Sequence, residues 1–230
     1  MFIFNSSIGK KFIQAVSGAF LIVFLGLHVT INSFSVIDTF TGRFGAPDGL
    51  FQKGCDFMAL PIVTIMVPVL AAGFLIHILY GLWLTYRNIR ARGGVNRYAV
   101  SNKGAADSWS SRNMMVLGIV ILGFIFYHLL HFWAKMQLQM FLGGEEGNPY
   151  LLLTTTFGSW INLVLYLVWF AALWFHLTHG FWSMFQTVGW DGQTWFKRIK
   201  VIGIIVVTVL CLAFAAVAVN AFVQANFILA

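Results

Sequence analysis

Residues 157–185 read FGSWINLVLYLVWFAALWFHLTHGFWSMF, a run that lacks Asp, Glu, Lys and Arg but contains two histidines. About 20 apolar residues in helical conformation are enough to cross the hydrocarbon core of a bilayer. Four similar runs predict further spans at about 12–34, 60–86, 114–141 and 201–227. We therefore expect an all-α, polytopic membrane protein with five transmembrane helices, folded as a single domain over residues 1–230.

Charge is scarce and unevenly distributed along the chain. Only 9% of the residues are charged, whereas soluble domains carry about 25%. Most of the 14 Lys and Arg residues fall in the N-terminus, the second connection (87–113) and the fourth connection, and most of the seven acidic residues fall on the opposite side. The positive-inside rule then predicts a cytoplasmic N-terminus and an external C-terminus. This topology explains the net charge of +7 without a nucleic-acid partner, although a basic cytoplasmic face could also dock a partner subunit.

All six histidines lie in the first four predicted spans. They are His28 in the first, His77 in the second, His128 and His131 in the third, and His176 and His179 in the fourth. Ionisable residues at membrane depth usually face a bundle interior or a functional path. A single such histidine is most simply a buried imidazole bonded to a neighbouring helix. Six histidines with a regular pattern favour a function as ligands.

The pattern consists of two repeats. The second and fourth spans share H-x-x-x-G-x-W, and in the first and third spans a glycine precedes a histidine by ten residues. The repeats are His77, Gly81 and Trp83; His176, Gly180 and Trp182; Gly18 and His28; Gly118 and His128. In an up-and-down bundle the first and third spans lie diagonally opposite, as do the second and fourth. The sequence thus predicts two histidine pairs across the core of helices one to four, at levels roughly 12–15 Å apart.

Each predicted pair suits a haem, because the iron takes one imidazole from each side of the porphyrin. Zinc would need three or four ligands at one level, which one pair does not supply. Gly81 and Gly180 lie one helical turn from His77 and His176, on the side that a porphyrin would contact. Gly18 and Gly118 lie about 15 Å along their helices from His28 and His128, at the depth of the other pair.

Four polar residues remain as candidates for contacts around the haems. His179 stands where the second span has Tyr80, and it could donate to a haem propionate or a quinone, or be a satisfied core histidine. His131 competes with His128: centring of the span favours His131, whereas the glycine spacing favours His128. Gln14 and Ser17 could bond propionates, although polar residues near a membrane interface need no such role. The isolated Cys55 and Cys211 give no disulfide, zinc or c-type haem motif.

These residues resemble the di-haem cytochrome b membrane anchor of succinate:quinone oxidoreductases, which include succinate dehydrogenases and quinol:fumarate reductases. The resemblance covers nearly the whole chain and rests on specific stretches: QAVSG (14–18), HILYGLW (77–83), FYH (126–128) and HLTHGFW (176–182). It implies that His28 and His128 bind an outer haem b and that His77 and His176 bind an inner haem b.

The resemblance also implies partners and a location. A cytoplasmic flavoprotein with FAD would interconvert succinate and fumarate, and an iron–sulfur subunit would connect it to the inner haem. A quinone, menaquinone in this reading, would react within the membrane. The chain itself would have no dicarboxylate site, would sit among the lipids of a bacterial inner membrane, and could belong to a dimeric complex. Some members carry a proton-transferring Glu two residues before the fourth-span ligand; Trp174 stands there, so we expect that route to be missing.

Other classes of membrane protein fit the histidine pattern less well. The five-span, quinol-oxidising cytochrome of respiratory nitrate reductases uses histidines on its second and fifth spans, and the fifth span here has none. The cytochrome b of bc complexes places two ligands about thirteen residues apart on each of two helices, a spacing that is absent here. A cofactor-free transporter or assembly protein with buried polar contacts remains the alternative, and it would be colourless when purified.

Overall fold

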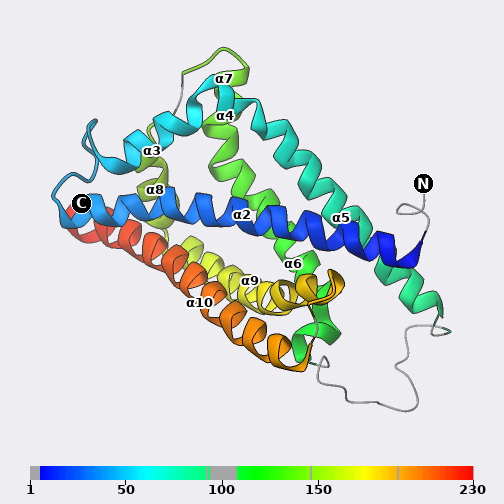
Figure 1. The fold of residues 1–230 in the computed structure, drawn as a ribbon. Helices are drawn as coiled ribbons and strands as arrows, with labels where there is room; N and C mark the ends of the chain where they lie inside the picture. Colours follow the sequence, from blue (N-terminus) through cyan, green and yellow to red (C-terminus); the bar gives the residue numbers. More distant parts are fainter. Residues whose placement is uncertain (1–5, 92, 94–107, 146, 191, 230) are drawn as a thin grey trace. The chain divides into compact units, whose positions relative to one another are not determined.

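The computed structural model describes residues 6–91, 93, 108–145, 147–190 and 192–229 (Figure 1). All of the regular secondary structure in these residues is helical. Five segments are long and apolar enough to cross a membrane. They are Ile8–Phe40, Pro61–Ala91, Trp109–Lys135, Trp160–Thr187 and Gln193–Ile228. The predicted all-α, five-span, multi-pass membrane architecture is thereby confirmed.

Each span is built on one long helix. These helices are α2 (Ser7–Phe40), α5 (Met66–Ala91), α6 (Trp109–His131), α9 (Trp160–Thr187) and α10 (Gln193–Val223). Short elements flank them: α3 (Leu50–Ala59), α4 (Pro61–Thr64), the 3-10 helix η1 (Trp133–Lys135), α7 (Gln137–Phe141), α8 (Pro149–Phe157) and the π-helical η2 (Gln224–Ile228). In the most apolar stretch of each span between 0% and 39% of the residues are buried, so most of the apolar surface is free to face lipid.

The helix boundaries differ from the predicted spans at several places. Pro61 starts α4, and the second span is interrupted at Ile65; Pro68 lacks the N–H that would bond the Thr64 carbonyl across this break. The first connection, expected over 35–59, is helical at both ends, because α2 continues to Phe40 and α3 begins at Leu50.

The third and fourth spans also have other boundaries than expected, since α6 begins at Trp109 and α9 covers Trp160–Thr187. Helix α6 ends at His131 rather than continuing to Phe141, and η1 and α7 form separate short helices. Phe157 belongs to α8, which Asn148 caps by accepting a hydrogen bond from the Leu151 N–H at 3.1 Å. In the second connection, Arg92, Arg97 and Lys103 lie outside the described residues.

By internal packing the chain divides into two compact units. The first comprises Met1–Phe24, Pro68–Gly118 and Phe175–Val207, and the second comprises Leu25–Val67, Ile119–Trp174 and Thr208–Ala230. Each unit takes residues from all five long helices. The expectation of a single domain over residues 1–230 stays a prediction.

Candidate functional site

The first unit contains the inner histidine pair, His77 on α5 and His176 on α9. Their ring centroids are 6.4 Å apart and their planes are inclined at 70°. The Nδ1 atom of His176 is buried and has no hydrogen-bond partner among the described residues. The two rings predicted to form a pair from the H-x-x-x-G-x-W repeat therefore do lie close together within one unit.

Two glycines provide space for these imidazoles. A Cβ atom on Gly18 would lie 3.2 Å from Cε1 of His77, and a Cβ atom on Gly118 would lie 3.9 Å from Cε1 of His176. Gly18 and Gly118 are thus placed at the inner pair, the depth expected from their ten-residue separation from His28 and His128. The space beside Gly180 is open, with nothing within 4 Å of its Cβ position, whereas a Cβ on Gly81 would meet Nε2 of Gln14 at 3.3 Å.

Gln14 and Ser17 on α2 make polar contacts with the inner pair. Nε2 of Gln14 lies 3.3 Å from Nδ1 of His77 and 3.4 Å from its Nε2, and Oγ of Ser17 lies 3.3 Å from Nδ1. Ser17 also donates to the Gln14 carbonyl at 3.1 Å. Because Oε1 of Gln14 is buried and has no partner in the described part of the chain, this side chain has unused hydrogen-bonding capacity beside the imidazole.

His179 lies one turn after His176 but contacts a different neighbour. Its ring meets that of Trp182 edge-on, with centroids 4.8 Å apart, and its Nδ1 is buried without a partner among the described residues. This arrangement leaves both predicted interpretations of His179 open, as a donor to a ligand or as a core histidine.

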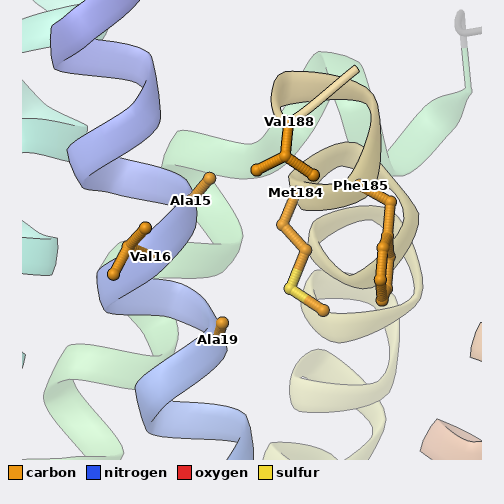
Figure 2. A pocket seen from close by; sticks show the side chains of 6 residues that line it. All are labelled: Ala15, Val16, Ala19, Met184, Phe185 and Val188. Carbon is orange, nitrogen blue, oxygen red and sulfur yellow. The ribbon is translucent and has the colours of Figure 1, made fainter. Parts of the chain in front are cut away.

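An apolar pocket of about 230 Å³ lies between α2 and α9 in the first unit (Figure 2). Six side chains line it: Ala15, Val16, Ala19, Met184, Phe185 and Val188. None of them offers a side-chain hydrogen bond, so polar contacts to a ligand near this part of α2 would come from Gln14 and Ser17.

A second pocket, of about 310 Å³, is lined by Lys10, Leu79, Tyr80 and Trp83. Nζ of Lys10 lies 4.0 Å from the centroid of the Trp83 ring, and the Arg87 guanidinium lies 5.0 Å from it. Cations favour the faces of aromatic rings. Trp83 therefore holds two positively charged side chains at this end of α5. This is the end that the positive-inside rule predicts to be cytoplasmic.

The second unit contains the outer histidine pair, His28 on α2 and His128 on α6. Their ring centroids are 5.8 Å apart and their planes are inclined at 88°. Phe214 packs against His28 at 5.8 Å, and Trp169 and Tyr166 pack against His128 at 5.9 and 6.4 Å. Nδ1 of His128 is buried and has no partner among the described residues.

His131 is held away from this pair by its own hydrogen bond. Its Nδ1 lies 2.9 Å from the Tyr127 carbonyl, to which it donates, and its ring packs on that of Tyr127 at 4.1 Å. Of the two candidate partners for His28 on the third span, the structure therefore brings His128 into contact. This is the residue that the glycine spacing favours over His131.

Both pairs have ring separations close to that of two imidazoles that share one metal ion. With a metal–nitrogen distance of about 2.0 Å, as in zinc–imidazole bonds, and about 1.1 Å from nitrogen to ring centroid, two axial imidazoles have centroids about 6.2 Å apart. The observed separations are 6.4 and 5.8 Å. The unpartnered Nδ1 atoms of His128 and His176 also fit a missing group, since buried polar atoms are normally satisfied.

A buried carboxylate that sequence reasoning missed organises the far end of α2. Asp38 is fully buried and accepts hydrogen bonds from the Leu50 and Phe51 N–H groups, each at 2.8 Å, and from the Tyr150 hydroxyl at 2.6 Å. It thereby places negative charge at the N-terminus of α3, where the helix dipole favours an anion. Gly49 is required here, because a Cβ atom would collide with the Tyr150 hydroxyl.

No protein-family model, no curated protein and no solved structure matches this chain. The functional assignment therefore depends on the side chains described above.

Proposed function

We propose that the chain is the membrane anchor and electron-transfer subunit of a succinate:quinone oxidoreductase, with two haems b. The observation that carries the proposal is the presence of one imidazole pair in each compact unit, with centroids 6.4 and 5.8 Å apart. His77 and His176 would bind the inner haem, and His28 and His128 the outer haem. Each haem would supply a one-electron centre between the iron–sulfur subunit and the quinone.

The chain's own residues supply position and environment for this chemistry. The imidazoles are attached to membrane-spanning helices, which hold their relative positions. Gly18 and Gly118 keep space beside the inner rings, and Gln14 and Ser17 provide hydrogen-bonding groups there. Aromatic rings pack around His128 at the outer site. Burial and hydrogen bonds of this kind set the reduction potential of a haem.

The proposed partners follow from the same assignment. The N-terminus and the basic ends of α5 and α6 would face the cytoplasm of a bacterium, where the iron–sulfur subunit and the FAD-containing flavoprotein would dock. Positive charge around Trp83 supports such a docking face. Menaquinone is the proposed membrane substrate. Trp174 donates to Thr208 at 2.8 Å, and it offers no titratable group for proton transfer at this position.

The test is to purify the chain from its native membrane in mild detergent. We expect two larger subunits to co-elute, b-type bands in the optical spectrum, and two haems per chain in a pyridine haemochrome assay. Succinate should reduce both haems. A colourless protein would refute haem binding and favour the cofactor-free transporter or assembly protein. Haem without succinate-driven reduction would instead favour another di-haem, quinone-reactive cytochrome.

A further inference from the structure

Three buried polar atoms at the outer histidine pair have no hydrogen-bond partner among the described residues. They are Nδ1 of His128, the hydroxyl of Tyr166 and Nε1 of Trp169. Tyr166 is only 2% exposed, so neither water nor lipid headgroups can satisfy its hydroxyl. An unsatisfied donor inside a membrane protein costs several kcal/mol. Three such atoms on rings that pack against one another indicate that a bound group completes the site.

Tyr166 and Trp169 present these atoms from one face of α9. They are three residues apart, which places them on neighbouring positions of the helix surface, and their rings meet edge-on with centroids 5.5 Å apart. Both rings pack against the ring of His128, at 6.4 and 5.9 Å. Phe124 stacks on Trp169 at 5.4 Å, with an interplanar angle of 5°, so the indole is held in place.

The chemistry of these atoms specifies the missing partner. The indole N–H can only donate, and the phenol hydroxyl donates readily. A set of donors without an acceptor calls for a carboxylate or carbonyl oxygen. We infer that Tyr166 and Trp169 form a donor pair for a carboxylate oxygen of the haem held by His28 and His128. This inference rests on the proposed function.

The donor pair would set the reduction potential of the outer haem. Hydrogen bonds from Tyr166 and Trp169 offset the negative charge of the carboxylate, and this charge otherwise favours the ferric state. Removing one donor should therefore lower the potential of the outer haem. A hydrogen bond to an ionised group is among the stronger ones. We expect the ratio of reduced to oxidised outer haem at fixed solution potential to fall about tenfold, which is about 59 mV for one electron.

The experiment is an optical redox titration of the purified complex, freed of quinone, in Tyr166→Phe and Trp169→Phe variants. Phenylalanine at position 166 removes only the hydroxyl, whereas phenylalanine at position 169 removes the N–H together with part of the indole ring. The second variant serves if the first fails to assemble. Tyr127→Phe is the matched control, because the Tyr127 hydroxyl already donates to Oδ1 of Asn162 at 2.7 Å. The inner haem is an internal control in every sample.

The expected result is two haems per chain in all variants, with one component shifted to lower potential in Tyr166→Phe and Trp169→Phe alone. Unchanged potentials in both, or an equal shift in Tyr127→Phe, would overturn the inference while leaving haem binding intact. A changed KM for quinol with unchanged potentials would also overturn it, because the donors would then serve a quinone carbonyl. Wild-type protein without haem would instead refute the proposed function itself.

Discussion

Gly18→Ala tests the inner site through the tightest contact of any glycine with a histidine. The added methyl group would lie 3.2 Å from Cε1 of His77, so the ring must move by a few tenths of an ångström. Metal–ligand distances tolerate only about 0.2 Å. Gln14 and Ser17 already contact the same imidazole at 3.3–3.4 Å, which limits how it can adjust. We therefore expect the affinity for the inner haem to fall by about tenfold or more, the range found when ligand orientation is disturbed.

Gly118→Ala is the matched control for this prediction. Its methyl group would lie 3.9 Å from Cε1 of His176, an ordinary van der Waals distance, so the inner haem should be retained. The assay is haem per chain by pyridine haemochrome, combined with a redox titration that resolves the two components. Gly18→Ala should show a depleted inner component and a normal outer one. Full inner occupancy in Gly18→Ala, or equal loss in both variants, would refute the reasoning from Cβ clearance.

Three further predictions concern the outer half of the chain. His128→Ala should reduce the haem content from two per chain to one, whereas His131→Ala should leave two; the reverse result would assign His131 as the ligand. Asp38 and the three groups that donate to it form what we call the Asp38 array. Asp38→Asn removes the charge and one acceptor from this array. We expect the free energy of unfolding to fall by about 2–3 kcal/mol, which would lower the thermal midpoint by about 4–12 °C. Burial is the main cause that raises the pKa of Tyr150, and the hydrogen bond to Asp38 raises it further. The folded state therefore favours the neutral phenol. This contribution to the free energy of unfolding should be complete below about pH 10 and should be lost as the pH rises through the raised pKa. Tyr150→Phe should abolish this alkaline loss in pH-dependent melting curves, and an unchanged slope would contradict that assignment.

The five spans were predictable because hydropathy and length are local properties of the chain. The spacing of glycine and histidine was informative for a similar reason, since a helix converts ten residues into about 15 Å of depth. It predicted that Gly18 and Gly118 lie at the depth of the inner histidine pair. The clearances of 3.2 and 3.9 Å that distinguish Gly18 from Gly118 could not be predicted, because they depend on how neighbouring helices rotate and approach.

Helix ends and the Asp38 array depend on contacts that are distant in sequence. Asp38 looked like one of several acidic residues in an external connection, yet its partners are 12, 13 and 112 residues away. Ser35 and Asp38 are both fully buried, so these two polar residues of the predicted first connection belong to the interior of the second unit. Only the pairing of α2, α3 and α8 reveals this, and no local pattern encodes it.

The Asp38 array also makes the peptide segment 41–48 a convenient place for a reporter. The last turn of α2 fixes one end of this segment, and the start of α3, which donates to the Asp38 carboxylate, fixes the other. Between them, the side chains of Arg43 and Asp48 are 53% and 66% exposed and form an ion pair with an N–O distance of 3.7 Å. An epitope tag inserted at Pro47 would therefore remain accessible without disturbing any histidine. Antibody staining of intact cells against permeabilised ones would then read out which side of the bilayer this segment occupies.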